Sequence, residues 1–449
     1  MTVTTNRRTF IREAGSATAA ITLGGTLPAF SAASYRRILG ANERITAAVM
    51  GVNNRGLSVS TNFAGQPDCE VQYICDVDSR AMQRCIDAIE KRQQKRPKGE
   101  KDFRKALDDK QLDLLIVTAP DHWHAPAALL AVAADKHVYL EKPCSHNPAE
   151  GEMLVEAAKK TGKLMQMGNQ RRSWPNVMAA IRELHEGVIG RPYYAKTWYT
   201  NNRESIGFGK TTQIPDWLDF DLWQGPAPRR PYKDNLIHYN WHWFWHWGTG
   251  EALNNGTHMA DLARWGLQAD YPTKVTSAGG RYRFQDDWET PDTQHIDIEF
   301  GNGSLLTWEG RSCNGKSIEG STVGVIFYGE KGSLLIESGN TYKIFDLKSK
   351  LLKEVKNDLR AEARDTSGPG QELDAFHIRN FFDAIRKGTT LHSDILSGHK
   401  STLLMQLGNI AQHVGRTLHT DPANGRILHD KEAMGLWKRA YEKGWEPKV

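Results

Sequence analysis

Cysteine is scarce in this 449-residue sequence, and most of the chain lacks long apolar runs and blocks of one charge. The five cysteines form no CxxC pair, which argues against a disulfide framework or a zinc site. No dense basic block accompanies the net charge of +5, so a nucleic-acid partner is not expected. Beyond the N-terminal region no stretch approaches the ~18 uninterrupted apolar residues of a membrane helix, so the mature chain is not expected to span a membrane. The length and a hydrophobic content of 39% are typical of a two-domain globular protein.

The N-terminal region has a different composition from the rest. Arg7 and Arg8 precede Phe10 and a mildly apolar stretch at residues 14–30, which ends in small residues. This arrangement resembles a twin-arginine export signal, whereas glycines and a proline would interrupt an ordinary amphipathic helix. We therefore expect a signal peptide at 1–33, an N-terminal arm at 34–43, transient contact with the twin-arginine translocase, and export to the periplasm.

Residues 44–166 alternate between strand and helix patterns. Short apolar stretches have the length of buried strands, and the stretches between them have helical spacing. The alternation predicts a parallel, doubly wound Rossmann sheet with right-handed crossovers. We expect strands at residues 44–50, 70–75, 112–118 and 136–140, and helices at 79–91 and 126–134.

The pattern changes in residues 167–449. Several stretches alternate apolar and polar residues with period two, which predicts an open, mainly antiparallel sheet with one covered face. Gly301-Asn302-Gly303 is typical of a hairpin turn between two of these strands. The fold class is therefore α/β, with a Rossmann domain followed by an α+β domain. The strands are expected at 191–198, 274–277, 294–300, 304–308 and 323–328, and helices at 372–387 and 397–416.

A glycine turn follows the first strand. Gly51 and Gly56 occupy the first and third glycine positions of a dinucleotide-binding turn, and Asn53 replaces the second. Asparagine tolerates positive φ and its amide can bond a phosphate, so the turn remains a candidate cofactor site. We expect Asn54 and Arg55 to contribute to it, with Arg55 facing the phosphates.

Asp76 ends the second strand, where an acid accepts hydrogen bonds from the adenosine ribose. A carboxylate there repels a 2′-phosphate, so NAD is favoured over NADP. The alternative role is a helix N-cap, which Asp78 could supply equally well.

Further candidates follow the third and fourth strands, at the edge of the sheet where ligands collect. Pro120 and His124 follow the third strand, and Glu141 and Lys142 follow the fourth. A lysine there can meet a bound nicotinamide. The histidine spacing does not require a metal, and none is expected.

A tryptophan-rich stretch at residues 241–247 leads into a second polar cluster. If the segment after Gly250 is helical, Asn254, His258 and Asp261 share one face. Indole rings such as that of Trp245 offer faces to a sugar, although alternating tryptophans are also ordinary core packing.

Together these motifs resemble the Gfo/Idh/MocA (glucose-fructose oxidoreductase, inositol dehydrogenase, rhizopine catabolism) oxidoreductase family. The resemblance implies that Lys142 and His258 are catalytic and that Asn254 stands where the family has an aspartate. It also implies a sugar or glycoside substrate, a homo-oligomer, and a second domain at residues 167–449 that binds the substrate and forms the oligomer. The expected substrate contacts in this domain include Asn169, Arg172 and Trp174. The motifs that carry it lie at residues 118–124, 141–143, 167–175, 256–261 and 377–382.

The predicted function is hydride transfer between a sugar ring hydroxyl and a nicotinamide cofactor. His258 would accept the hydroxyl proton, with help from Asp261, Glu251 or water because an amide cannot take a proton. Export implies that NAD stays tightly bound and is recycled in place. Two alternatives remain: a glycosidase that works by transient oxidation, as in glycoside hydrolase family 109, and a non-catalytic sugar-binding relative.

Overall fold

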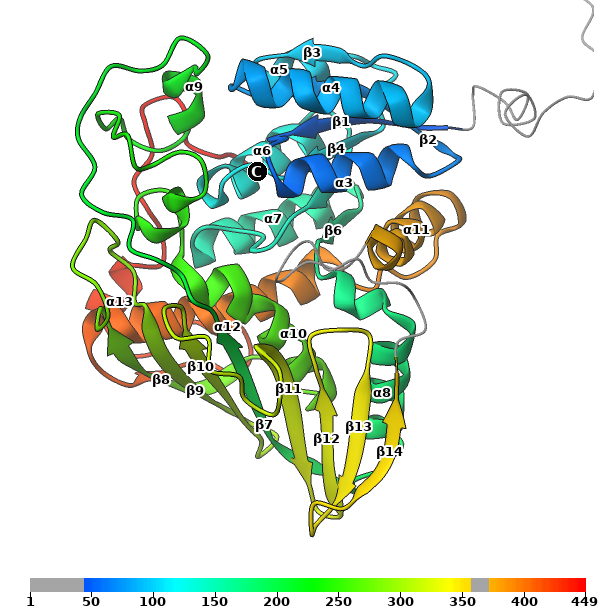
Figure 1. The fold of residues 1–449 in the computed structure, drawn as a ribbon, viewed down its shortest axis with the longest axis vertical. Coiled ribbons are helices and arrows are strands. Elements are labelled where there is room, and N and C mark those ends of the chain that lie inside the picture. The colour runs from blue at the N-terminus through cyan, green and yellow to red at the C-terminus, as the bar shows by residue number, and fades with distance from the viewer. Residues whose placement is uncertain (1–43, 357–370) are drawn as a thin grey trace, which may run out of the picture. The chain divides into compact units, whose positions relative to one another are not determined.

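The computed structural model describes residues 44–356 and 371–449 (Figure 1). The expected export signal and N-terminal arm lie outside the described residues. Within the described part of the chain, no helix combines the length and apolar character needed to cross a membrane.

The first half is a six-stranded parallel sheet in the order β3-β2-β1-β4-β5-β6. The order reverses between β1 and β4, which places a ligand site beyond the carboxyl ends of these strands. The parallel sheet and its four central strands confirm the prediction. The strands are β1 Ile45–Met50, β2 Cys69–Cys75, β3 Lys98–Glu100, β4 Leu114–Val117, β5 His137–Leu140 and β6 Met165–Met167.

The helices of this half are α3 Arg55–Ala64, α4 Ser79–Gln93, α5 Phe103–Leu107, α6 Asp121–Ala133 and α7 Pro148–Thr161. Helix α6 begins at Asp121, so the prediction of a start near Pro126 was wrong. Pro126 has no N–H to donate to the carbonyl of His122 four residues earlier. Arg439 Nη2 instead donates to that oxygen at 2.6 Å, so the proline is accommodated inside the helix.

The second half is built on a nine-stranded sheet in the order β14-β13-β12-β11-β7-β10-β9-β8-β15. Its pairs are antiparallel except β7 with β10, which are parallel, so the prediction of a mainly antiparallel sheet is confirmed. The strands are β7 Pro192–Thr200, β8 Pro272–Gly280, β9 Thr293–Phe300, β10 Leu305–Arg311, β11 Val323–Gly329, β12 Gly332–Ile336, β13 Tyr342–Asp346, β14 Leu351–Val355 and β15 Leu418–His419.

Helices cover one face of this sheet (Figure 1). They are α8 Pro175–His185, α10 Thr257–Gly266 and α12 Ile395–Val414. Trp308, Phe327 and Leu403 belong to the core between helices and sheet, and each is fully buried. Burial of such large apolar side chains is the main force that holds this layer together.

Two later segments return to the first half. Helix α11, Gln371–Lys387, places Phe381 and Phe382 in the same core as Phe63 and Tyr139. The segment after α13 (Lys431–Gly435) brings Arg439 to Glu150 of α7 at 2.8 Å and Trp445 to Trp123 of α6, with ring centroids 5.2 Å apart. The red C-terminal segment can be followed toward α6 in Figure 1. Residues distant in sequence therefore pack against the helices and core of the Rossmann half.

Candidate active site

The turn after β1 has the backbone geometry of a dinucleotide-binding turn. Gly51 has φ of +83°, and a Cβ there would lie 2.6 Å from Ala119 Cα. A Cβ at Gly56 would lie 1.9 Å from Gly51 O, so both positions require glycine. Asn54 precedes α3 with φ of 40°, and Asn53 Oδ1 accepts a hydrogen bond from Arg84 at 2.8 Å.

Asp76 lies at the end of β2 and does not cap the following helix. Asp78 is the N-cap of α4, accepting from Arg80 N at 2.8 Å and Ala81 N at 3.3 Å. Asp76 accepts from Val52 N at 2.6 Å and Asp78 N at 2.8 Å. Burial raises the pKa of Asp76, although these two N–H groups oppose the shift. Each carboxylate oxygen keeps acceptor capacity for a ribose hydroxyl.

Arg55 and Glu141, both predicted to contact the cofactor, are bound to each other. Arg55 Nη2 lies 3.0 Å from Glu141 Oε1, and Arg55 Nη1 lies 2.9 Å from Asp374 Oδ2 of α11. The prediction that Arg55 faces the phosphates is corrected: two buried carboxylates hold its guanidinium. Burial would raise the pKa of Glu141, but Arg55 and Lys142 outweigh burial and lower it. Sequence reasoning missed Asp374.

His124 fixes the loop beside Lys142. Its Nδ1 lies 2.6 Å from the carbonyl of Pro143 and its Nε2 lies 2.7 Å from the carbonyl of Ala119. Both ring nitrogens therefore face backbone oxygens and none is left for a ligand. Pro120 precedes α6 as its N-cap residue, at the carboxyl edge of the sheet.

Lys142 extends from the end of β5 to the second half of the protein. Its Nζ donates to Asn254 O at 2.5 Å and to Asn254 Oδ1 at 3.0 Å. Asn254 lies in a π-helical turn, Ala252–Gly256, directly before α10. Burial lowers the pKa of Lys142, while Glu141 and Asp121 oppose the shift. A lysine with a lowered pKa beside a nucleotide site can donate a hydrogen bond to a reacting oxygen.

A buried ion pair holds the Asn254 turn. Arg203 Nε donates to Glu251 Oε2 at 2.8 Å, and Glu251 Oε1 accepts from Asn254 Nδ2 at 3.3 Å. Glu251 also accepts hydrogen bonds from Asn255 and Ser312. Arg203 was not predicted, because nothing in its local sequence indicates a partner so far along the chain.

His258 lies one turn beyond Asn254, in α10. Its Nδ1 is buried and has no hydrogen-bond partner among the described residues. Burial lowers the pKa of His258 well below its ordinary value, and Lys142, Arg171 and Arg55 lower it further. His258 is therefore neutral at pH 7, which leaves it able to accept a proton.

Asp261 and Arg172, both predicted to contact substrate, form a buried ion pair instead. Arg172 Nε and Nη2 each donate to the Asp261 carboxylate at 2.8 Å, and Ser401 Oγ adds a third bond at 2.7 Å. Glu251 is similarly occupied by Arg203. Neither carboxylate orients His258, so that expectation is corrected.

Of the remaining predicted substrate residues, Asn169 has the strongest indication of a ligand. Both amide atoms of Asn169 are buried without a partner among the described residues, and an amide in that state is rare in a native fold. Trp174 is 1% exposed beneath the Arg171 guanidinium, which makes it part of the core. Trp245 is half-buried and its backbone N–H donates to Glu289 at 2.8 Å.

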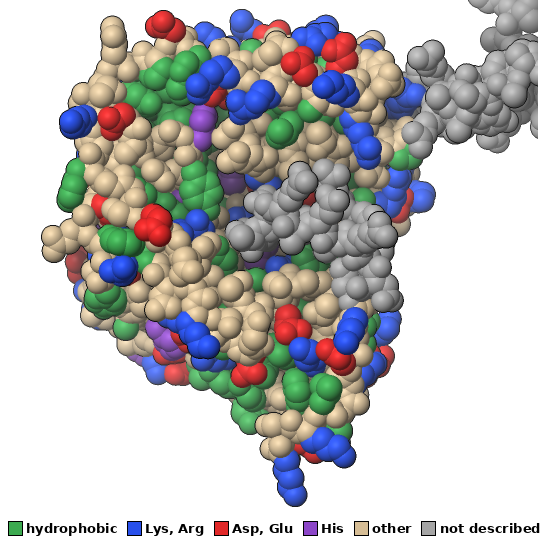
Figure 2. Space-filling view, viewed as in Figure 1, with side chains coloured by type: hydrophobic (Ala, Val, Ile, Leu, Met, Phe, Trp, Pro, Cys, Tyr) green, Lys and Arg blue, Asp and Glu red, His purple; other side chains and the backbone are tan. Residues whose placement is uncertain are grey.

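His242 was not predicted as a site residue. Its ring stacks on Trp241 with centroids 3.6 Å apart, and its Nδ1 lies 2.6 Å from Tyr239 O. Burial lowers the pKa of His242 well below its ordinary value, and Lys142 adds to the shift. The space-filling view is hollowed between the two halves, with basic and histidine side chains visible inside (Figure 2).

Over residues 44–356 and 371–449, no three His, Cys, Asp or Glu side chains are grouped to hold a metal ion.

Comparisons with known proteins match both halves of the chain. Residues 45–169 match the family description "Oxidoreductase family, NAD-binding Rossmann fold", and residues 197–447 match "Oxidoreductase family, C-terminal alpha/beta domain". A glycosyl hydrolase family 109 protein of Saccharopolyspora erythraea is 29% identical over 253 residues, 51% of this chain and 55% of that protein. An alpha-N-acetylgalactosaminidase of Shewanella oneidensis is 25% identical over 211 residues, 43% of this chain and 46% of that protein. The match thus spans about half the length of these curated relatives.

Solved structures share the fold along most of the chain. A levoglucosan dehydrogenase in complex with NADH and levoglucosan superposes with a TM-score of 0.65 at 17% identity, covering 84% of this chain and 99% of that one. An aldose-aldose oxidoreductase from Caulobacter crescentus has a TM-score of 0.64 at 16% identity, with the same coverage.

Proposed function

Because the chain belongs to the Gfo/Idh/MocA family of oxidoreductases and carries its NAD-binding Rossmann domain, we propose that it transfers hydride between a sugar or glycoside ring carbon and NAD. The observation that carries this proposal is the meeting of Lys142 and the Asn254 turn, one helical turn before the neutral His258. Lys142, which follows β5 at the carboxyl edge of the parallel sheet, and His258, which lies in α10, would thus handle the alkoxide and the proton.

The chain's residues support each part of the oxidation. His258 takes the proton of the ring hydroxyl, and Lys142 donates a hydrogen bond to the oxygen as it becomes a carbonyl. The C–H bond breaks with its electron pair, which leaves as hydride. NAD, when bound, supplies the acceptor for that hydride. Asn169 provides an unpartnered amide for a further sugar hydroxyl.

Single substitutions test these roles. In Lys142→Met and His258→Asn, NADH formation with glucose and with its methyl and p-nitrophenyl glycosides should fall by roughly 100- to 10,000-fold. NAD binding, measured as a rise in melting temperature, should persist. Lys348→Met and His295→Asn, both at exposed positions, serve as matched controls. Wild-type turnover in both active-site variants would exclude the mechanism.

A glycosidase that oxidises its substrate transiently is the second candidate. The relatives that belong to glycosyl hydrolase family 109 favour it, and the same Lys142 and His258 would serve its first step. Release of p-nitrophenol and monosaccharide without net NADH would support the glycosidase. Accumulation of a keto-sugar would support the dehydrogenase.

Periplasmic export and self-association complete the proposal. The Arg7-Arg8 pair supports passage through the twin-arginine translocase. Replacing both arginines by lysine should leave the protein in the cytoplasmic fraction. We also propose a homo-oligomer, which light scattering of the purified protein would test against a monomer mass.

A further inference from the structure

A segment of the second half lies directly against the end of β2. Residues 214–221, which we term the clasp, join the Rossmann half through backbone hydrogen bonds. Ser79 N donates to Trp217 O at 3.0 Å, and Asp219 N donates to Val77 O at 3.0 Å. Asp78 and Leu218 form an antiparallel bridge between these bonds. The clasp therefore pairs like a short antiparallel strand with Val77 and Asp78, directly after Asp76.

Side chains hold the clasp at both edges. The Arg80 guanidinium lies 3.4 Å from the ring centroid of Trp217, and Lys101 Nζ lies 3.4 Å from Asp219 Oδ2. Leu218 and Phe220 are buried in a small apolar cluster of the second half that includes Trp223. One side of the clasp is thus anchored in its own domain and the other side in the Rossmann domain.

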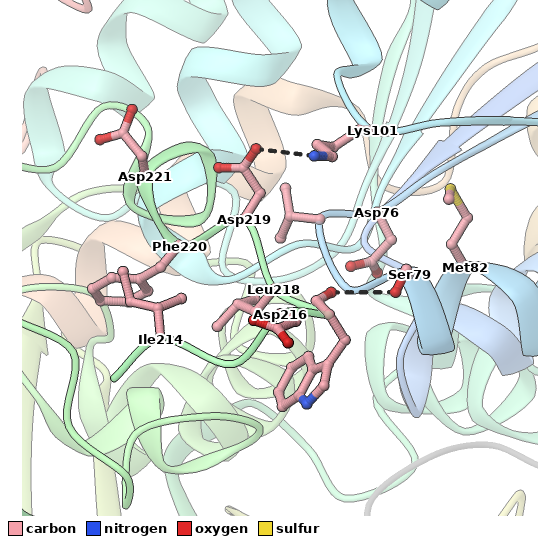
Figure 3. Close-up of a pocket in the computed structure, with 12 residues that line it drawn as sticks. Asp76, Ser79, Met82, Lys101, Ile214, Asp216, Leu218, Asp219, Phe220 and Asp221 are labelled. Carbon is pink, nitrogen blue, oxygen red and sulfur yellow. Dashed lines mark hydrogen bonds and ion pairs between the residues drawn. The ribbon is translucent and has the colours of Figure 1, made fainter. Parts of the chain in front are cut away.

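The clasp and the Rossmann half border a cavity of about 380 Å³. Asp76, Ser79 and Lys101 line it from the Rossmann half (Figure 3). Clasp residues complete the wall, so that Asp76 and the clasp share one cavity. The volume falls within the range of small-molecule sites, ~300–1,000 Å³.

We propose that the clasp retains NAD by closing over its adenosine half. The inference rests on the proposed function, because it takes the Asp76 cavity as the adenosine site. Opening of the two backbone hydrogen bonds and the Arg80–Trp217 contact would widen the cavity, so these contacts slow the departure of a nucleotide held there. A slow opening step gives slow release of NAD without requiring additional contacts to the nicotinamide. This provides a physical basis for a cofactor that stays bound outside the cytoplasm.

The rate of NAD release tests the clasp. In rapid-dilution experiments that follow NADH fluorescence, Trp217→Ala should release NADH at least ~5-fold faster than the wild type, because the substitution removes the cation–π pair with Arg80. AMP should also bind more weakly to this variant, whereas nicotinamide mononucleotide should bind equally well to both proteins. Phe208→Ala is the control, because Phe208 is 72% exposed and does not line the cavity.

A second variant covers the case in which Trp217→Ala does not fold. Asp219→Asn weakens the link to Lys101 while an asparagine can still cap α9, Phe220–Gln224, and it should also release NADH faster. If the folded variants release NADH at the wild-type rate, the proposal that the clasp retains NAD is wrong. A wild-type protein that has been freed of bound nucleotide and whose melting temperature still does not respond to added NAD would instead overturn the proposed function.

Discussion

Lys142 Nζ lies 2.5 Å from the carbonyl oxygen and 3.0 Å from the side-chain oxygen of Asn254, so a lysine of the Rossmann domain is held by one residue of the second domain. Asn254 is an amide, and it binds the lysine directly. The ammonium is oriented without a neighbouring negative charge from this residue, and its proton is correspondingly less tightly held.

Asn254 should affect turnover less than Lys142 does. Asn254→Ala removes one of the two hydrogen bonds and keeps the backbone one, so turnover should fall roughly 10-fold, the effect of one hydrogen bond to a charged group. Asn254→Asp should raise the pKa of Lys142 by placing a carboxylate beside it. Steady-state kinetics of both variants provide the measurement. Wild-type turnover in Asn254→Ala would show that the contact is not used.

The pH dependence of kcat/KM should follow the two lowered pKa values. His258 must be neutral, and its pKa lies well below 6.5, so activity should remain level as pH falls from 7 through 6.5 and decline only at lower pH. Lys142 must be protonated, and its pKa is lowered from 10.5, so activity should decline at a pH below 10.5. Lys142→Arg, if active, should lose this alkaline decline because a guanidinium keeps its proton. A decline of kcat/KM centred at pH 6.5 would contradict the assignment of a neutral His258 with a lowered pKa as the proton acceptor.

Substitution of Arg55 should lower the free energy of unfolding more than substitution of a residue that only binds phosphate would. Arg55→Met leaves the buried carboxylates of Glu141 and Asp374 without their cation, which should lower the free energy of unfolding by about 3 kcal/mol. Urea denaturation provides the measurement. Adding Asp374→Asn to Arg55→Met should recover part of the loss. Unchanged stability combined with weaker NAD binding would instead indicate that Arg55 contacts the phosphates of the cofactor.

His399 should make the fold sensitive to acid. Burial lowers its pKa to about 4, with Glu152 opposing and Lys400 adding to the shift. The folded pKa lies below the unfolded value of 6.5, so the stabilisation is complete above pH 6.5 and is lost as pH falls toward 4. The loss should be roughly 1.4 kcal/mol per pH unit. His399→Leu should show a shallower decline in urea denaturation between pH 6.5 and 5, and identical slopes would contradict this origin.

Sequence patterns predicted the fold where burial leaves a periodic signal. β1, β4 and β5 consist mainly of buried apolar residues, and β2 alternates buried apolar with half-buried polar residues before its buried end. The strands β9 and β11 of the second sheet were equally recognisable. β3 and β6 were not predicted, because three residues are too few for periodicity and β3 is Lys-Gly-Glu. Both exist because neighbouring strands supply their hydrogen bonds. The parallel pairing of β7 with β10 is likewise a tertiary property.

The candidate site was predictable where a residue follows a strand or turn, and at Asn254 and His258 from their helical spacing. Gly51, Asp76 and Lys142 could be located from the ends of buried strands. The partners of the charged residues could not, because Arg55 and Asp374 are 319 residues apart in sequence. The same reason explains why Arg172 and Asp261 were assigned to substrate rather than to each other.

The contact between Arg439 and Glu150 has a consequence for how the protein matures. These residues are 289 positions apart, and the Glu150 side chain has no exposed surface. The ribosome therefore makes the nucleotide-binding half long before the cation that neutralises its buried acid. A nascent chain that ends before Arg439 cannot form this ion pair, so this part of the first domain is completed only late in translation.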